Sequence, residues 1–439
     1  MTQSLRYTTG SREIVPGQGA PQLPAPATPA VPTGPAPYAT VVANAPRAIT
    51  LGTLNIGEQG KRFVNDVLDS NRLSSGKYTK DFESTFAAIH QSKYGVFCNS
   101  GTSALQIALA ALKEVHGYED GDEILVPATT FIATSNVVLQ NNLKPVFVDV
   151  DPNTFNMNPE EIASRITKRT RAIIPVHLFG LPANMPAIMR IANDHYLQVI
   201  EDSCETMFAG IEGKSVGSFG HMACFSTYVA HLVVGGVGGL VVTKDLGLEE
   251  RCRSLMAHGR DSIYTNIDQD DTDDQKLKKQ MIERRYSFDR VGYSYRCTEL
   301  EAAIALSELY RGESNIAIRR INAAYLTDQL RRFEGVLQLP MIPKGYTHSF
   351  MMYPMVLSPT IDRDELLLFL ENHNIETRYL FPLLTQPIYK KLFPGLDAQY
   401  PVAQLLAKHG FFIGMHQGMT GEDMCYIAET FYEFFERKA

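Results

Sequence analysis

Residues 94–112 read YGVFCNSGTSALQIALAAL, a strand-like run that passes through small residues into a helix-like run. The apolar, β-rich residues from Tyr94 to Cys98 predict a strand, and the residues through Leu112 have helical spacing. Between them, the loop from Asn99 to Ala104 places small side chains at a helix N-terminus, where backbone N–H groups can converge on an anion. The loop therefore predicts a phosphate pocket, although the same residues would also form an ordinary helix N-cap.

The alternation of strand-like and helix-like runs continues on both sides of this stretch. A helical pattern covers residues 58–73, and short β-rich runs separated by amphipathic segments occupy residues 123–127, 145–149, 172–176, 198–201 and 239–243. This order predicts an α/β fold with a largely parallel sheet covered by helices. After a long helical pattern around residues 298–333, the order changes to a smaller α+β unit.

The chain is expected to divide into three regions, namely an arm at 1–48, a large domain at 49–315 and a small C-terminal domain at 316–439. Its 439 residues are enough for two folded units. The stretch from Val15 to Pro46 is rich in Pro, Ala, Gly and Thr and almost uncharged, so burial cannot offset its chain entropy. We expect a disordered tail, and an extended arm along a partner subunit is the alternative.

The composition argues against several classes of function. With 41 basic and 48 acidic residues the net charge is -7, which provides no basic surface for nucleic acid or for an anionic membrane. The six cysteines lack the paired spacing of zinc sites or disulfide frameworks, and no signal peptide or membrane span is recognisable. We therefore expect a cytoplasmic protein with no metal, no nucleic-acid partner and no membrane attachment.

A second candidate group lies at the end of the predicted strand that contains Val199 and Ile200. In open α/β sheets, ligands bind at the carboxyl ends of strands, and Glu201 and Asp202 stand at such an end. A carboxylate that points into a cleft there can keep the pyridinium nitrogen of a cofactor ring protonated. A solvated acidic loop is the competing interpretation.

The motifs follow one another in an order that is more specific than any of them alone. Asn-Ser-Gly-Thr-Ser at 99–103 precedes Pro-Ala-Thr-Thr-Phe at 127–131, Glu-Asp-Ser-Cys-Glu-Thr at 201–206, Gly-Ser-Phe-Gly at 217–220, and Phe-Ser with a glycine-rich strand at 225–239. From about Leu51 to the C-terminus, this series resembles the DegT/DnrJ sugar aminotransferase family. The resemblance implies a fold-type-I pyridoxal-phosphate-dependent transferase, with a mostly parallel seven-stranded sheet in the large domain and a smaller C-terminal α+β domain.

The resemblance also implies roles for individual residues. Gly101, Thr102 and Ser226 match the positions that bind the cofactor phosphate, and Asp202 matches the partner of the pyridine nitrogen. Phe131 matches the aromatic residue that stacks on the cofactor ring, although a plain core phenylalanine is the alternative.

Three positions depart from the family pattern. Glu205 stands where the family often has Gln or His, and its position implies a place near the cofactor hydroxyl. Ser294 replaces an asparagine that usually reaches the phosphate of the neighbouring subunit, and Val237 replaces a common glutamate. The shorter serine puts cofactor affinity in question.

His231 stands where ordinary family members have the lysine that binds the cofactor covalently. An imidazole cannot make that stable link, so pyridoxal or pyridoxamine 5'-phosphate would be held noncovalently and would exchange. The ordinary imidazole pKa of about 6.5 suits proton abstraction near neutral pH, so the position keeps a base. An engineered substitution at this position is the remaining alternative.

Further segments resemble one branch of the family, the histidine-bearing GDP-4-keto-6-deoxymannose 3-dehydratases. They are Glu201 to Gly239, Ala257 to Arg260 and Gly410 to Gln417, whereas Thr129 to Phe131 and His177 to Gly180 are more similar to the aminotransferase branch. The resemblance implies a homodimer with shared active sites that removes the C3 hydroxyl of a nucleotide-linked 4-keto-6-deoxyhexose, with glutamate as amino donor. The cysteine pattern of a related iron–sulfur branch is missing, so we expect no cluster.

Two other functions stay open, together with three tentative substrate contacts. The chain would be an aminotransferase that uses exchangeable pyridoxamine phosphate, or an inactive cofactor- or sugar-binding protein. His258, His348 and Arg378 are candidates for contacts to the substrate or the partner subunit. The competing interpretation makes both histidines structural and Arg378 an ordinary surface residue.

Overall fold

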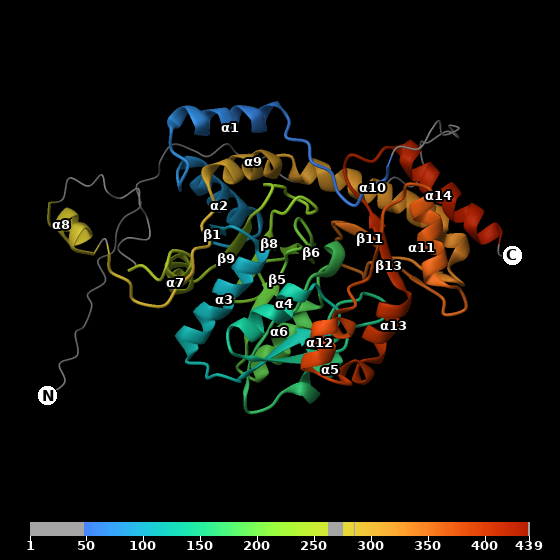
Figure 1. Ribbon diagram of the computed structural model, residues 1–439, viewed down its shortest axis with the longest axis horizontal. Coiled ribbons are helices and arrows are strands. Elements are labelled where there is room, and N and C mark those ends of the chain that lie inside the picture. The colour runs from blue at the N-terminus through green and yellow to red at the C-terminus, as the bar shows by residue number, and fades with distance from the viewer. Residues whose placement is uncertain (1–47, 262–274, 285, 438–439) are drawn as a thin grey trace. The chain divides into compact units, whose positions relative to one another are not determined.

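The computed structural model describes residues 48–261, 275–284 and 286–437 (Figure 1). Seven strands form the large sheet: β1 (Tyr94–Cys98), β2 (Glu123–Pro127), β3 (Lys144–Val148), β4 (Thr170–Ile173), β5 (Gln198–Asp202), β8 (Met222–Ser226) and β9 (Gly239–Thr243). Their order is β1-β9-β8-β5-β4-β2-β3. Strand β9 is antiparallel to both neighbours, and the other pairs are parallel. The predicted α/β class with a mostly parallel seven-stranded sheet is confirmed.

Helices cover both faces of this sheet, because successive strand residues point to opposite sides. Val241 packs in one core cluster with α3 (Gly101–His116), α4 (Ile132–Gln140) and α7 (Leu246–Met256), which lie on one face. Val242, the next residue, packs on the other face with α2 (Lys77–Ile89) and α9 (Glu299–Leu309). The remaining helices of this part are α1 (Glu58–Ser70), α5 (Pro159–Arg165), α6 (Met185–Asp194) and α8 (Gln275–Arg284).

A second, smaller sheet lies in the C-terminal part of the chain. Its antiparallel order is β10-β11-β13-β12, formed by Leu337–Gln338, Met352–Leu357, Gly410–Gly414 and Thr377–Tyr379 respectively. Residues of α10 (Gly312–Leu330), α11 (Arg363–Asn372) and α14 (Gly421–Glu436) complete its core. Two short helices, α12 (Pro387–Leu392) and α13 (Pro401–His409), connect β12 to β13.

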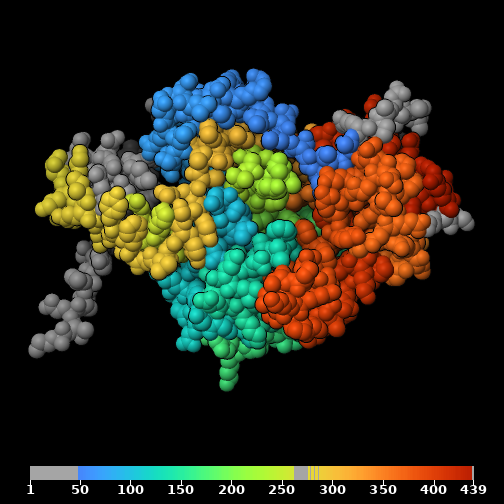
Figure 2. All heavy atoms as spheres, in the orientation of Figure 1, coloured from blue at the N-terminus to red at the C-terminus, as the bar shows by residue number. Residues whose placement is uncertain are grey.

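The connection through α13 packs against the large sheet. Asp149, just after β3, accepts hydrogen bonds from the backbone N–H groups of Val402 and Ala403, each at 2.9 Å. The Tyr400 hydroxyl donates to the carbonyl oxygen of Phe147 at 3.2 Å. Figure 2 shows these C-terminal elements, in orange and red, directly against the cyan and green elements of the large sheet.

Several boundaries differ from those predicted from the sequence. The predicted strand at 172–176 begins earlier and ends at Ile173, and strand β8 was not anticipated as a separate element. The long helical pattern at 298–333 is divided into α9 and α10, because the helix is interrupted by a turn at Tyr310 and Arg311. The predicted boundary between residues 315 and 316 lies inside α10.

By its internal contacts the chain divides into residues 1–39 and residues 40–439, and all described residues belong to the second unit. The predicted arm at 1–48 lies outside the described residues except for Ala48. Ile49 then joins the C-terminal part through a hydrogen bond from its N–H to the Asn374 carbonyl at 2.8 Å. Within the described ranges, no helix combines the length and apolarity that a membrane crossing requires.

Candidate active site

Three strand ends meet at Gly101, the first residue of α3. A Cβ atom placed on Gly101 would lie 2.7 Å from the Cys204 Sγ atom and 2.8 Å from the Ser226 Cβ atom. The N-terminus of α3 is therefore pressed against the turn after β5 and against the end of β8, and only glycine fits between them. Ser100 caps the helix by accepting a hydrogen bond from Ser103 N–H at 3.0 Å, as the N-cap interpretation predicts.

This arrangement suits a phosphate group. The first turn of a helix has backbone N–H groups without intrahelical partners, and the helix dipole favours an anion there. Thr102 is exposed in this turn, and Ser226 lies beside Gly101. The three residues predicted to hold a phosphate are thus in one place.

Asp202 ends β5 and is 4% exposed. One carboxyl oxygen accepts from the Thr134 hydroxyl at 2.7 Å, and the other accepts from the Cys204 N–H at 3.2 Å. Burial raises the pKa of Asp202, and these hydrogen bonds act in the opposite direction. A buried carboxyl fixed in this way is suited to bind a cationic ring nitrogen, which would restore its charged form.

Glu201, the neighbour of Asp202, points to the other side of the strand and accepts hydrogen bonds from backbone N–H groups. Its carboxylate accepts from the N–H groups of Gly217, Phe219 and Gly220 at 2.7 to 2.8 Å. It therefore fixes the Gly-Ser-Phe-Gly loop to the end of β5. The solvated acidic loop, the competing interpretation, is wrong for both carboxyl groups.

His177 is a buried partner of Glu201 that the sequence did not single out as a site residue. Its Nδ1 atom accepts from the Ala183 N–H at 3.0 Å, so its hydrogen is on Nε2 and is donated to Glu201 at 3.0 Å. The backbone N–H of His177 also donates to the Asp202 carbonyl at 2.9 Å. The loop after β4 and the end of β5 are thereby locked together.

His231 lies in the loop between β8 and β9 and is partly exposed. Its Nδ1 atom lies 3.2 Å from the Ser226 carbonyl oxygen. Because a carbonyl only accepts, Nδ1 carries the hydrogen, and Nε2 has the free lone pair of a base. Burial lowers the pKa of His231 to about 4, and the buried cation of Arg319 adds to this effect. The imidazole is therefore neutral at pH 7.

Phe131 follows β2 and is 54% exposed. The alternative interpretation, a plain core phenylalanine, is therefore wrong. Its ring meets the edge of Phe381 at 5.9 Å between centroids, and Phe381 stacks on Phe179 at 5.2 Å. An exposed aromatic face held by further aromatic rings is suited to cover a planar cofactor.

Glu205 lies in the turn after Asp202 and is 6% exposed. Its Oε2 atom accepts from the Phe179 N–H at 2.9 Å. Burial and, to a smaller extent, the charge of Asp202 raise the pKa of Glu205 to about 8.

Four further residues were predicted to contact the cofactor or the substrate, and no described side-chain contact joins them to the residues around Gly101 and Asp202. They are Ser294, His258, His348 and Arg378. His258 and Ser294 lie on two paired, exposed segments, and the His258 Nε2 atom is 3.1 Å from the Arg296 guanidinium. His348 is buried, stacks on Phe350 at 3.9 Å, and its pKa is lowered to about 3 by burial.

Arg378 is exposed on β12 and forms an ion pair with Glu376. Within the described ranges, no group of three His, Cys, Asp or Glu side chains is arranged to hold a metal ion.

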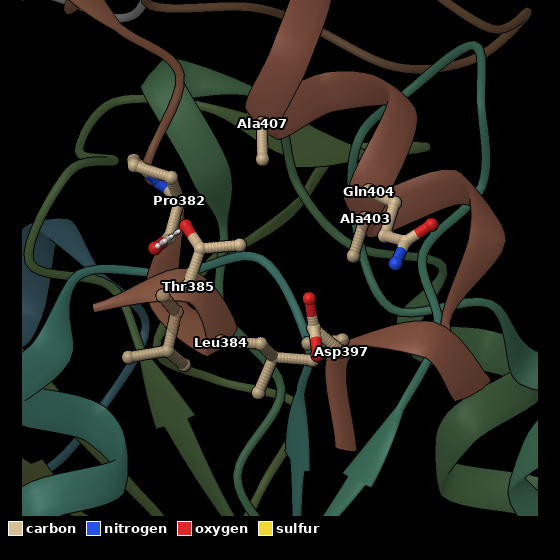
Figure 3. A pocket seen from close by; sticks show the side chains of 9 residues that line it. Pro382, Leu384, Thr385, Asp397, Ala403, Gln404 and Ala407 are labelled. Carbon is tan, nitrogen blue, oxygen red and sulfur yellow. Dashed lines mark hydrogen bonds between the residues drawn. The ribbon is translucent and has the colours of Figure 1, made fainter. Parts of the chain in front are cut away.

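A small pocket is lined by Ala128, just after β2, and by the segments that contain Pro382 and Gln404. Figure 3 shows the side chains of Pro382 and Gln404 at this pocket, where the Thr385 hydroxyl donates to the Pro382 carbonyl at 3.0 Å. Its volume of about 10 Å³ admits roughly one water molecule. It is too small for a cofactor.

Comparison with known proteins shows which family the sequence matches. The DegT/DnrJ/EryC1/StrS aminotransferase family matches residues 54–432. A GDP-perosamine synthase of Escherichia coli O157:H7 is 32% identical over 380 residues, which cover 86% of this chain and 96% of that protein. A dTDP-4-dehydro-2,6-dideoxy-D-glucose 3-dehydratase of Saccharopolyspora spinosa is 31% identical, over 84% of this chain and 82% of that protein.

The fold is also that of solved family structures. The GDP-4-keto-6-deoxy-D-mannose-3-dehydratase of E. coli, solved with bound hydrated PLP (pyridoxal 5'-phosphate), superimposes with a TM-score of 0.78 at 28% identity. The match covers 87% of this chain and 98% of that one. The predicted fold-type-I architecture is confirmed.

Proposed function

The chain belongs to the DegT/DnrJ/EryC1/StrS aminotransferase family of enzymes, and we propose that it is a 3-dehydratase of a nucleotide-linked 4-keto-6-deoxyhexose. One observation carries the proposal. The Nε2 atom of His231 keeps a lone pair at the position where ordinary members have a lysine, and the surroundings of Gly101, Ser226 and Asp202 fit a pyridoxal-type cofactor.

Each residue of the pocket has a task in this proposal. Gly101, Thr102 and Ser226 bind the cofactor phosphate, Phe131 covers the ring, and Asp202 keeps the ring nitrogen protonated. When bound, the cofactor supplies a ring that accepts an electron pair, and this allows a substrate hydroxyl next to a keto-derived carbon to leave. The Nε2 atom of His231 would take a proton from the carbon that carries the cofactor nitrogen and would pass it to the departing hydroxyl, which leaves as water.

The absence of a lysine at this position accounts for dehydration instead of amino transfer. With no side chain to recapture the cofactor covalently, the nitrogen remains on the product, and water then releases it as ammonia. Pyridoxal and pyridoxamine phosphate are held noncovalently in this proposal, with glutamate as amino donor and without an iron–sulfur cluster.

The proposal extends to the assembly of the protein. Two copies share their active sites, with Ser294 facing the partner's cofactor phosphate, and His258, His348 and Arg378 serve the substrate or the partner. The division into domains at 49–315 and 316–439, after an arm at 1–48, and a cytoplasmic location belong to the same proposal.

A direct assay tests the reaction. The purified chain is incubated with pyridoxal phosphate, glutamate and GDP-4-keto-6-deoxymannose, and ammonia and the sugar product are measured. We expect equal amounts of ammonia and 3-deoxy sugar, and we expect His231→Asn to abolish both. His195→Asn, at an exposed histidine directly after α6, is the matched control and should retain activity. Accumulation of an amino sugar would reject dehydration.

Amino transfer is the second candidate function. The GDP-perosamine synthase relative, at 32% identity over most of both chains, supports it. In that case the nitrogen of glutamate is retained in the product, and ¹⁵N-glutamate distinguishes the two reactions by mass spectrometry. An inactive cofactor- or sugar-binding protein is the third candidate, supported only by the departures at Val237 and Ser294.

A further inference from the structure

Two buried threonines connect the loop after β2 to the carboxyl group of Asp202. Thr130 is 2% exposed, and Thr134, in the first turn of α4, is 1% exposed. The Thr134 hydroxyl donates to Oδ2 of Asp202 at 2.7 Å, and the hydroxyl oxygens of Thr130 and Thr134 are 2.8 Å apart. Hydrogen bonds of this length join the three side chains in one buried chain.

The direction of this hydrogen-bond chain follows from the carboxylate. An ionised carboxylate only accepts, so the Thr134 hydrogen points to Asp202, and the Thr134 oxygen is left to accept from Thr130. Hydroxyl groups that donate in the same direction polarise one another, which strengthens the last hydrogen bond of the chain. Burial raises the pKa of Asp202, and the hydrogen bond from Thr134 is the largest effect that lowers it. The chain therefore favours the charged form of a carboxyl group that is almost fully buried.

The same hydrogen bond fixes the plane of the carboxyl group. The backbone N–H of Asp202 donates to the Pro175 carbonyl at 2.9 Å, but this contact leaves the side chain free to rotate. Thr134 occupies one carboxyl oxygen, and the Cys204 N–H reaches the other at the longer distance of 3.2 Å. Because Thr134 belongs to α4 and is itself buried, its hydroxyl is held in a defined place. Thr134 therefore sets the direction in which the carboxylate can accept a further hydrogen bond.

We infer that Thr134, oriented by Thr130, is the positioning residue that holds the Asp202 carboxylate toward the ring nitrogen of the cofactor. The inference rests on the proposed function, because it concerns the same cofactor site. Replacement of the Thr134 hydroxyl by a methyl group would keep the volume of the side chain but leave one carboxyl oxygen without its donor. The ring nitrogen would then meet a carboxyl group that turns more freely and takes up a proton more readily.

The test compares two ligands that differ only at the ring nitrogen. They are pyridoxal phosphate and its carbocyclic analogue, in which a C–H group replaces that nitrogen. Phe131 lies between Thr130 and Thr134 in the sequence and is proposed to cover the ring of either ligand. Damage to this loop should therefore weaken the binding of both ligands alike, whereas loss of the aligned carboxylate should weaken only the binding of pyridoxal phosphate.

Thr134→Val should bind pyridoxal phosphate about tenfold more weakly than the wild type in calorimetric titrations, with a change of less than about twofold for the analogue. Thr134→Ser keeps the hydroxyl and should bind both ligands within about twofold of the wild type. Thr430→Val is the matched control, because Thr430 is 3% exposed and its hydroxyl donates to the Tyr426 carbonyl inside α14. It should change neither affinity. Equal losses for the two ligands in Thr134→Val, or no loss, overturn the inference and leave the proposed function in place.

Thr130→Val tests the second hydrogen bond of the chain. It should weaken the binding of pyridoxal phosphate by about threefold and leave that of the analogue unchanged, because Asp202 keeps its direct donor. Since Thr130 acts through Thr134, the double variant should bind pyridoxal phosphate no more weakly than Thr134→Val alone. Losses that multiply in the double variant would show that Thr130 acts by another route. If Thr134→Val does not fold, the lack of a selective loss in Thr130→Val overturns the inference. A wild-type chain that binds neither ligand overturns the proposed function and this inference together.

Discussion

The backbone carbonyl of Ser226 accepts the Nδ1 hydrogen of His231 at 3.2 Å, and the side chain of the same serine lies against Gly101. One residue therefore fixes the orientation of the base and forms part of the predicted phosphate site. With Nδ1 bound to a carbonyl, Nε2 keeps the lone pair of a base, and among the described residues no hydrogen bond joins the ring to a carboxylate of the kind that activates other catalytic histidines. Burial lowers the pKa of His231 although the carbonyl hydrogen bond acts in the opposite direction, and the consequences can be measured.

The pH dependence of activity should show a base that stays neutral in acid. Because burial lowers the pKa of His231 to about 4, kcat/KM should remain level from pH 7 to about pH 5 and fall as pH drops through about 4. The same shift means that the unfolded state binds the proton more readily, so His231 also reduces stability as pH falls below about 6.5. Rates measured across this range, with circular dichroism to confirm folding, check the prediction. A half-maximal rate near pH 6.5 would contradict it.

Borohydride should not attach the cofactor to the wild-type chain. Reduction of the protein loaded with pyridoxal phosphate should leave its mass unchanged, because His231 cannot form the reducible link. Lys244, just after β9, donates to the Ser218 carbonyl at 3.0 Å and is held away from that role.

His231→Lys is the positive control for this measurement, because it restores the residue type of ordinary family members. It should gain the mass of one reduced cofactor at residue 231, located by peptide mass spectrometry. A gain of this mass on any lysine of the wild-type chain would contradict noncovalent binding.

Much of the site was predictable because it lies at strand ends. Gly101 and Asp202 stand in different parts of the sequence, yet each follows closely on a short apolar run that predicts a strand. The carboxyl ends of parallel strands share one edge of a sheet, so this pattern is enough to bring the two residues together. Ser226 was assigned only through the family resemblance, because all five residues of β8 are buried and its sequence has no alternation of apolar and polar residues that would predict the strand.

The partners of Glu201 could not be predicted in the same way. Its three backbone donors and His177 depend on the path of two loops, and loop paths leave no periodic signal in the sequence. His348 illustrates the same limit, because its burial against Phe350 comes from long-range packing of the C-terminal sheet.

Gly101→Ala should weaken cofactor binding with a moderate loss of stability. The added methyl group would lie 2.7 Å from the Cys204 Sγ atom, so α3 must move away from Ser226 and the phosphate position opens. We expect the affinity for pyridoxal phosphate to fall by about tenfold or more. Gly335→Ala is the matched control, since nothing lies within 4 Å of its added methyl group and its affinity should not change. Equal affinities of the two variants would show that Gly101 does not form the phosphate site.

Glu201→Ala should destabilise the protein more than any change at an exposed glutamate. The substitution removes the acceptor of three backbone N–H groups and of the Nε2 hydrogen of His177, and each of these groups that is buried costs about 1 to 3 kcal/mol. Allowing for partial relaxation and entry of water, we expect a loss of about 3 to 5 kcal/mol in the free energy of unfolding, measured by chemical denaturation. Glu334→Ala should cost no more than about 0.5 kcal/mol. Because Glu201 fixes the end of β5, the weakened variant should also bind pyridoxal phosphate poorly at temperatures where it is still folded. Normal binding with normal stability would mean that the loop at 217–220 is held by contacts other than this carboxylate.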